Sequence, residues 1–236
     1  MYDFSNITMV CMNARNPDTC PTGDEVNNFK DNLHIGLNYC SKFFNFKEIV
    51  YVGTHNPEVV GVKYIPIETH DIQYYNYWCM YEMTKHFDTE YVLSYQDDGF
   101  PLNPELFNPQ VLEYDYVGAP CRVKYKENGE PTYEGYGLEL IEGGGLTLRS
   151  KRLMDYLSQH SEYQIEDGHE DGFICIKRRT KLIENGLRIC PAHISKGFVV
   201  HHPIDDTHTI YNTFGFHGRD NKCVEAKRLM KQRMGW

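Results

Sequence analysis

The chain has 236 residues, of which 41% are hydrophobic and 24% charged, and its formal net charge is -9 because 33 acidic residues outnumber 24 basic ones. This composition is typical of a globular protein and excludes a fibre or a disordered tail. The negative charge argues against a nucleic-acid partner, whose phosphates require basic side chains. No apolar run reaches the roughly 18 to 20 residues that cross a bilayer, and the first residues lack a signal-peptide pattern. We therefore expect a cytoplasmic protein without a transmembrane segment.

The first hundred residues alternate short runs of β-branched and aromatic residues with longer helical patterns. Strands are expected at residues 7–12, 48–53, 62–67 and 91–95, and helices at residues 24–44 and 71–87. This alternation is typical of crossover units that build a mostly parallel sheet flanked by helices. Ligands of such sheets bind beyond the carboxyl ends of the strands, so the polar residues at those ends are the first candidates for function.

After residue 100 the pattern loosens into loops that contain Pro and Gly. Strands are expected at residues 114–118 and 146–148, and helices at residues 151–159, 170–185 and 224–233, the second of which ends at Gly186. No repeat or linker divides the chain. We therefore expect one α/β domain over residues 1–236, with a loop-rich C-terminal half that extends the same sheet.

Eight cysteines stand at positions 11, 20, 40, 79, 121, 175, 190 and 223. They form no CxxC pair, and several lie in apolar segments. This pattern favours buried, reduced thiols over disulfides or zinc ligands.

The sharpest candidate for chemistry is the acidic turn Gln96, Asp97 and Asp98, which follows the apolar strand at residues 91–95. Mg²⁺ and Mn²⁺ prefer oxygen ligands and are commonly held by one or two carboxylates together with substrate phosphates. The turn therefore suits the binding of a metal diphosphate. The alternative is an Asp-Asp-Gly turn that only closes the strand.

Three consecutive glycines, Gly143, Gly144 and Gly145, precede an amphipathic strand. Glycines let the backbone approach a ligand closely and direct its amides at hydroxyls or phosphates. The segment matches neither a P-loop nor the dinucleotide-binding GxGxxG pattern. A plain hairpin or flexible turn is the alternative.

Glu170 and Asp171 open the helix expected at residues 170–185. Acidic residues in a first helical turn stabilise the free amides there, which is one explanation for the pair. The functional alternative is a general base that takes a proton from a hydroxyl nucleophile.

Residues 201–218 contain four histidines and two aspartates, but not the HxxxH spacing of a zinc protease. Histidines in loops are usually only hydrogen-bonded or exposed. His217 is the exception because of the resemblance described below.

The expected C-terminal helix carries the basic residues Lys222, Lys227, Arg228, Lys231 and Arg233. Such a helix permits peripheral contact with an anionic membrane surface. A solvated helix face explains the same residues equally well.

Five motifs in order resemble a small glycosyltransferase family of bacteria, phages and large DNA viruses, whose members are similar to GT-A fold transferases. They are YVLSYQDDGFPLNPELF (91–107), YDYVGAP (114–120), GGGLTLRS (143–150), EDGFIC (170–175) and FGFHG (214–218). The resemblance implies a GT-A-like, Rossmann-like fold. It further implies a nucleotide-binding half at residues 1–100, a donor-sugar and acceptor half at residues 101–220, and a C-terminal helix at residues 221–236.

The resemblance also implies a role for each matching residue. Asp98 and His217 would bind Mn²⁺ or Mg²⁺, Asp171 would be the catalytic base, and Glu170 would contact hydroxyls of the donor or acceptor. The nucleotide would contact Asn13, Arg15, Gln96, Asp97 and Asp98, and the donor sugar and acceptor would lie against Tyr116, Ala119, Pro120, Gly143, Gly144 and Gly145. The chain departs from many GT-A enzymes at Gln96, where they carry Asp.

The expected activity is transfer of a sugar from a nucleotide-diphosphate sugar, such as a UDP-sugar, to a hydroxyl of a glycan, a lipid carrier or a protein. A base on the face opposite the leaving group makes the transfer inverting. Three alternatives stay open: a metal-dependent hydrolase, a carbohydrate-binding module without catalysis, and a nucleotidyltransferase that uses a sugar phosphate and a nucleoside triphosphate.

Overall fold

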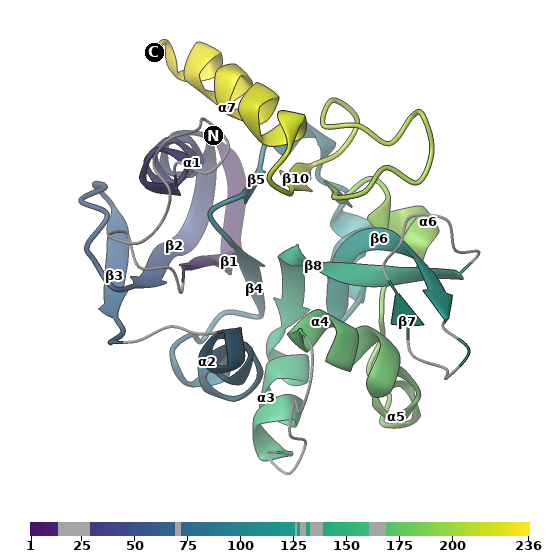
Figure 1. The fold of residues 1–236 in the computed structure, drawn as a ribbon. Helices are drawn as coiled ribbons and strands as arrows, with labels where there is room; N and C mark the ends of the chain where they lie inside the picture. The colour runs from purple at the N-terminus through teal and green to yellow at the C-terminus, as the bar shows by residue number, and fades with distance from the viewer. Residues whose placement is uncertain (14–28, 69–71, 126, 128–130, 133–138, 161–168) are drawn as a thin grey trace.

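The computed structural model describes residues 1–13, 29–68, 72–125, 127, 131–132, 139–160 and 169–236 (Figure 1). Within these ranges a seven-stranded sheet runs in the order β3-β2-β1-β4-β8-β6-β7, and a three-stranded sheet runs in the order β5-β10-β9. Helices flank both faces of the larger sheet. The α/β fold class predicted from the sequence is therefore confirmed.

Parallel strands form one half of the larger sheet: β3 (Val62–Pro66), β2 (Phe44–Gly53), β1 (Tyr2–Met12) and β4 (Tyr91–Tyr95). In β1, Met9 and Cys11 belong to one hydrophobic core, whereas Val10 and Met12 belong to a second one. From Ile7 to Met12 the strand therefore buries both of its faces, which explains the nearly continuous apolar sequence of this half, whereas Asp3, Ser5 and Asn6 in the first half are exposed.

The other half of the sheet is antiparallel. Strand β8 (Glu139–Ser150) lies between β4 and β6 (Tyr116–Tyr125), and β6 pairs with the short β7 (Pro131–Thr132). The small sheet, made of β5 (Gly99–Pro101), β9 (Val199–Val200) and β10 (Gly215–His217), begins directly beyond the carboxyl end of β4. This small sheet brings the late His217 next to the acidic turn.

Two long helices, α1 (Phe29–Phe43) and α7 (Asn221–Met234), share one core and lie side by side (Figure 1). The other helices are α2 (Ile72–Tyr77), α3 (Lys151–Gln159), α4 (Glu170–Gly172), α5 (Arg179–Glu184) and α6 (Ala192–Ser195). Two π-helical turns, η1 (Trp78–Glu82) and η5 (Phe173–Lys177), extend α2 and α4, and short 3-10 turns form η2 (Met83–Lys85), η3 (Pro104–Leu106) and η4 (Pro109–Glu113).

The strands expected at residues 62–67 and 91–95 and the helices expected at residues 151–159 and 224–233 are confirmed, with small shifts at their ends. The strands expected at residues 7–12 and 48–53 are confirmed as the second halves of longer strands that begin at Tyr2 and Phe44. The helix expected at residues 24–44 is described as helix from Phe29 to Phe43, and residues 24–28 lie outside the described part. The strand expected at residues 114–118 begins at Tyr116 and continues to Tyr125. The strand expected at residues 146–148 is the end of the much longer β8.

The helix expected at residues 71–87 is helical from Ile72 to Lys85, but its geometry changes from α through π to 3-10. Trp78 and Cys79 pack in the second core, whereas Met80 and Tyr81 pack in a third. The helix expected at residues 170–185 is wrong in its continuity, because Arg178 leaves helical geometry with φ -114° and ψ 0° and separates η5 from α5. Residue 71 lies outside the described part of the chain.

The cysteines that the structure describes are all buried and free, as predicted, and Cys20 lies outside the described residues. None of the helices described is both long and apolar enough for a bilayer crossing. Arg233 of the basic helix α7 is exposed, but its guanidinium also donates to the Leu102 carbonyl and to Oδ1 of Asn103 at 2.6 and 2.9 Å. These bonds hold α7 against the segment after β5.

Candidate active site

The acidic turn lies at the carboxyl end of β4, in the middle of the larger sheet. The Gly99 amide donates to the Gln96 carbonyl at 3.2 Å and closes the turn, while the Gln96 amide donates to the Gly145 carbonyl at 3.2 Å. Asp97 and Asp98 are only 2% and 7% exposed. Buried carboxylates require cations or hydrogen-bond donors close by.

The segment after β10 supplies these partners. Nη2 of Arg219 lies 2.8 Å from Oδ1 of Asp97, and Nε of Arg219 lies 3.2 Å from Oδ2 of Asp98. Nε2 of His217 lies 3.3 Å from the other Asp98 oxygen, Oδ1. The Gly218 amide donates to the Asp98 carbonyl at 2.9 Å. Residues 217–219 thus cover the acidic turn with two basic side chains.

His217 stands at the centre of a charged cluster. Burial by itself lowers the pKa of His217, but the negative charges of Asp98, Asp171 and Asp97 outweigh burial and leave this pKa raised. The ring of His201 meets the His217 ring edge to face, with centroids 4.4 Å apart. Burial, together with His217, lowers the pKa of His201 to about 2, so His201 stays neutral beside it.

The three glycines predicted as a ligand loop lie instead inside strand β8, which corrects the expectation of a hairpin or flexible turn. The register between β6 and β8 shifts between Val117 and Ala119, and Gly145 has φ +93°, so Gly144 and Gly145 form a bulge. A Cβ on Gly145 would overlap the His217 ring. Only glycine fits this backbone and this contact.

Asp171 faces the same bulge from the first turn of α4. Its Oδ2 accepts the Gly144 amide at 2.6 Å, and its Oδ1 accepts the Gly172 amide at 2.7 Å. A Cβ on Gly144 would lie 3.0 Å from Oδ2 of Asp171. The side chain is only half-buried, so a ligand at the bulge has access to it.

Glu170 points the other way, into the protein. It is 3% exposed, and its Oε1 accepts Nη2 of the fully buried Arg149 at 2.7 Å. Arg149 also donates to Oγ1 of Thr147 and to the Cys79 carbonyl, at 3.0 and 3.3 Å. Burial raises the pKa of Glu170, and the charge of Arg149 opposes that increase. Glu170 therefore anchors the start of α4 rather than facing the bulge.

The remaining predicted residues lie on β6 and at the end of β1. On β6, Tyr116 is buried, and Cζ of Arg149 lies over its ring at 5.6 Å from the ring centroid. Ala119 and Pro120 of the same strand pair with Gly143 and Glu142 of β8. Asn13 lies at the end of β1, where its amide donates to the Val52 carbonyl at 2.9 Å. Arg15 lies outside the described residues.

Three polar residues at this edge were missed from the sequence. Thr54 and His55 follow β2, beside Asn13 at the end of β1, and Arg219 follows β10. Thr54 and His55 stand directly after a predicted strand, and this position in the sequence is the signal that would have found them. Arg219 follows the FGFHG motif, but its contact with Asp97 and Asp98 becomes visible only in the structure.

The protein alone supplies only part of the ligands that a divalent metal would need at this site. Among the described residues, no three His, Cys, Asp or Glu side chains are arranged to hold a metal. Asp98 and His217 do present an oxygen and a nitrogen 3.3 Å apart, both on buried side chains. Two protein ligands suit Mn²⁺ or Mg²⁺ when phosphates of a substrate complete the coordination. The residues therefore fit a cation that binds together with a diphosphate.

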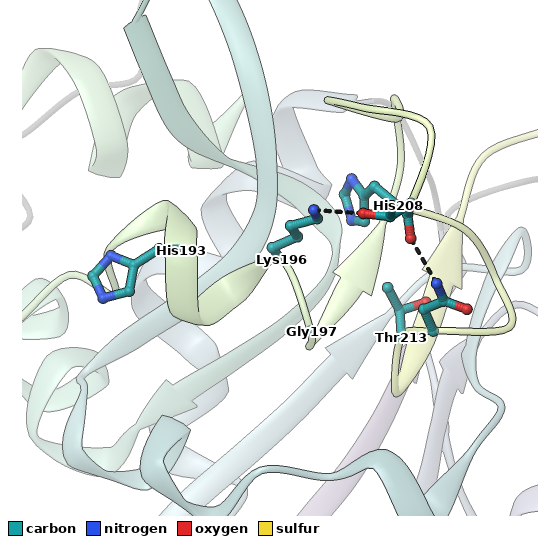
Figure 2. Close-up of a pocket in the computed structure, with 7 residues that line it drawn as sticks. His193, Lys196, Gly197, His208 and Thr213 are labelled. Carbon is teal, nitrogen blue, oxygen red and sulfur yellow. Dashed lines mark hydrogen bonds between the residues drawn. The ribbon is translucent and has the colours of Figure 1, made fainter.

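A separate pocket of about 210 Å³ lies beside α6 and contains none of the predicted site residues. Figure 2 shows Lys196 directed toward the segment that carries His208, whereas His193 points away. Nζ of Lys196 is held by Asp205 and Thr207 at 2.6 and 2.8 Å. Because its lysine is already neutralised, the pocket offers no free charge to a ligand.

Among solved structures, similar folds belong to enzymes of sugar and nucleotide chemistry. A glycosyltransferase involved in the glycosylation of the major capsid of PBCV-1 has 13% identity and a TM-score of 0.52, over 96% of this chain and 98% of that one. The 4-diphosphocytidyl-2C-methyl-D-erythritol synthase of Anaerococcus prevotii has 12% identity and a TM-score of 0.52, over 95% and 96%. The inositol-1-phosphate CTP transferase of T. maritima has 11% identity and a TM-score of 0.52, over 96% of both chains. These likenesses show the fold.

The chain spans about half, 48%, of the bifunctional IspDF of Campylobacter jejuni. No curated protein sequence matches it. A family profile described as "Protein of unknown function (DUF5672)" matches residues 60–217, which include the acidic turn, the glycine bulge, Asp171 and His217. The chain therefore belongs to the DUF5672 family, and its fold is GT-A-like.

Proposed function

We propose that this protein is a glycosyltransferase that moves a sugar from a nucleotide-diphosphate sugar to a hydroxyl of a glycan, lipid-linked or protein acceptor. The observation that carries the proposal is the convergence of the acidic turn and Asp171 on His217 and the glycine bulge of β8. A diphosphate site and a carboxylate base thus lie on two sides of one small backbone surface. A sugar between them would contact Gly143, Gly144 and Gly145.

Asp171 is the base in this proposal. Its oxygens each accept one backbone hydrogen bond and retain a lone pair for an acceptor hydroxyl. The carboxylate takes the hydroxyl proton while that oxygen bonds to the anomeric carbon. The bond from this carbon to the diphosphate breaks, and its electron pair leaves on the phosphate oxygen. Attack opposite the leaving group inverts the configuration.

The other residues bind and orient the donor. Asp98 and His217 would hold Mn²⁺ or Mg²⁺, which when bound neutralises charge on a leaving diphosphate. Asn13, Gln96 and Asp97 contact the nucleotide at the carboxyl ends of β1 and β4. Glu170, held by Arg149, positions the start of α4 and thereby Asp171.

A nucleotidyltransferase is the second candidate because two of the similar structures, a diphosphocytidyl-methylerythritol synthase and a CTP transferase, share the TM-score of the glycosyltransferase. It would join a sugar phosphate to a nucleoside triphosphate and release pyrophosphate. A glycosyltransferase instead releases a nucleoside diphosphate from a nucleotide sugar. The released product therefore separates the two candidates.

The first test is thermal unfolding with UDP, GDP, dTDP or CMP, each with and without Mn²⁺. A ligand at 100 times its Kd adds about 2.7 kcal/mol, which corresponds to a rise in Tm of several degrees. We expect one nucleotide to stabilise the wild type in a Mn²⁺-dependent way, and Asp98→Asn to lose this response. Asp206→Asn, the same change at an exposed loop position, is the control and keeps it.

The nucleotide that stabilises the protein then defines a panel of nucleotide sugars for turnover. Release of nucleoside diphosphate from one of them supports sugar transfer. Release of pyrophosphate from a nucleoside triphosphate and a sugar phosphate would instead establish the nucleotidyltransferase. Absence of binding by every nucleotide would refute both candidates and leave a carbohydrate-binding module.

A further inference from the structure

Arg219 occupies the position at the acidic turn that a bound cation would take. Its guanidinium spans both carboxylates, with Nη2 2.8 Å from Asp97 and Nε 3.2 Å from Asp98. The side chain is 20% exposed, whereas those of Asp97 and Asp98 are 3% and 9% exposed. The arginine therefore reaches the buried acids from the open side of the site.

The backbone fixes where this side chain starts. The amide before Arg219, that of Gly218, donates to the Asp98 carbonyl at 2.9 Å. The residue after it, Asp220, caps α7 by accepting the Lys222 amide at 2.8 Å. With its backbone held on both sides, Arg219 changes partners only through its side-chain torsions.

A guanidinium and a divalent metal compete for the charge of the same carboxylate, although they face different oxygens: Arg219 lies 3.2 Å from Oδ2 of Asp98, and His217 lies 3.3 Å from Oδ1. A guanidinium has five donors and no acceptor, so it does not ligate a metal, and its positive charge repels one. A metal that binds Asp98 with His217 must draw on the carboxylate that Arg219 already contacts. The released guanidinium has a natural partner in a diphosphate, whose oxygens match its planar fork.

We propose that Arg219 is an internal cation that competes with the divalent metal for the negative charge of Asp98, next to Asp97, and passes to the diphosphate of the donor when the metal binds. This inference rests on the proposed function, because it assigns the donor diphosphate to the same site. The competition by Arg219 keeps the affinity for the metal low until a nucleotide binds. The protein thus binds metal and donor together rather than metal alone.

The decisive measurement is the affinity for Mn²⁺ without nucleotide, read from the electron paramagnetic resonance signal of free Mn²⁺. Arg219→Gln removes the charge and keeps hydrogen-bonding capacity, and we expect it to bind Mn²⁺ at least tenfold more tightly than wild type. Arg219→Lys keeps the charge and should stay within threefold of wild type. Arg228→Gln, at a 67% exposed position of α7, should leave the affinity unchanged.

Thermal unfolding in EDTA shows whether each variant is folded, and the Arg219→Lys variant provides the comparison if Arg219→Gln is not. In that case, a tenfold gain of Mn²⁺ affinity in the lysine variant overturns the competition, because the charge is still present. Equal or weaker Mn²⁺ binding by folded Arg219→Gln overturns it as well. So does the absence of Mn²⁺ binding in both wild type and Arg219→Gln.

A second measurement separates this inference from the proposed function. At saturating Mn²⁺, we expect Arg219→Gln to bind the nucleoside diphosphate that stabilises the wild type at least tenfold more weakly, and Arg228→Gln to bind it normally. If Arg219→Gln binds Mn²⁺ no more tightly than wild type and still binds the nucleotide normally, only the role of Arg219 is refuted. Absence of nucleotide binding by the wild type would refute the glycosyltransferase while the Mn²⁺ comparison still stands.

Discussion

The backbone amide of Gly144 donates a 2.6 Å hydrogen bond to Oδ2 of Asp171, and this bond joins the glycine bulge of β8 to the first turn of α4. The bond orients the carboxylate over the backbone surface where a sugar would lie. It also explains why Gly144 has no side chain, since a Cβ there would stand 3.0 Å from the same oxygen. The proposed base and the glycine bulge are thus held together as one unit.

We expect Asp171→Asn to lower kcat by about 10²-fold or more, because the amide takes no proton from an acceptor hydroxyl. The folded structure should survive, since the amide oxygen still accepts one backbone bond. Initial rates of nucleoside diphosphate release measure the effect, with exposed Asp206→Asn as the control. A rate within a few-fold of wild type would remove Asp171 from this role.

Gly145 should tolerate no side chain. Its φ of +93° and the His217 ring against it predict that Gly145→Ala lowers the free energy of unfolding by about 2 kcal/mol or more. Gly197→Ala is the matched control, because its Cβ would meet nothing closer than 3.8 Å, and we expect a change within about 0.5 kcal/mol. Urea unfolding of both variants measures the difference. Equal losses would mean that the bulge relaxes around the methyl group.

Local pattern was enough to predict the parallel half of the sheet. The apolar run at residues 91–95 becomes β4 with the expected bounds, because helices bury both of its faces. The length of β8 was not predictable from its glycines, which have low strand propensity. Pairing on either side of them keeps the glycines in the strand: residues 146–150 pair with β4, and residues 139–143, 148 and 149 pair with β6. Tertiary pairing overrides local propensity there.

Residues of the candidate site could be predicted where they directly follow a strand or lie in one of the five motifs. Asp98 directly follows β4, but its approach to His217 is a contact between distant parts of the chain that only the resemblance indicated. Nothing local shows that Glu170 turns inward to Arg149 while its neighbour Asp171 turns outward. Helix geometry separates adjacent side chains, and the burial of Arg149 decides which of the two faces inward.

Replacing only one partner of the buried ion pair between Arg149 and Glu170 should strongly reduce the free energy of unfolding. Arg149→Met leaves the Glu170 carboxylate buried without its cation, and we expect a loss of about 3–5 kcal/mol in the free energy of unfolding. Adding Glu170→Leu should recover much of this loss. The exposed pair Lys63 and Glu48 serves as comparison, and Lys63→Met should cost less than about 1 kcal/mol. A double variant as unstable as the sum of both single ones would indicate that the pair is uncoupled.

His208 should make the stability of the protein fall in mild acid. Its Nε2 lies 3.1 Å from the Val199 carbonyl and its Nδ1 accepts the Ile204 amide at 3.3 Å, an arrangement that requires the neutral ring. Burial lowers the pKa of His208, and Lys196 and Lys222 lower it further. These effects outweigh the hydrogen bond to the Val199 carbonyl and the charge of Asp205, which both raise the pKa. The unfolded chain therefore binds a proton below pH 6.5 that the folded protein does not.

Stability is consequently complete above the ordinary histidine pKa and declines as the pH falls from about 6.5 toward the lowered folded value, by up to about 1.4 kcal/mol per pH unit. Urea unfolding at pH 8, 6 and 5 measures this slope. His208→Gln should reduce the slope by the contribution of His208, while His201, whose pKa is also lowered, keeps its own contribution, and the variant should be less stable at pH 8. His34→Gln, a change at an exposed position on α1, is the control and should keep the wild-type slope. The same slope in wild type and His208→Gln would mean that the ring is protonated in the folded state, with Nδ1 released from Ile204.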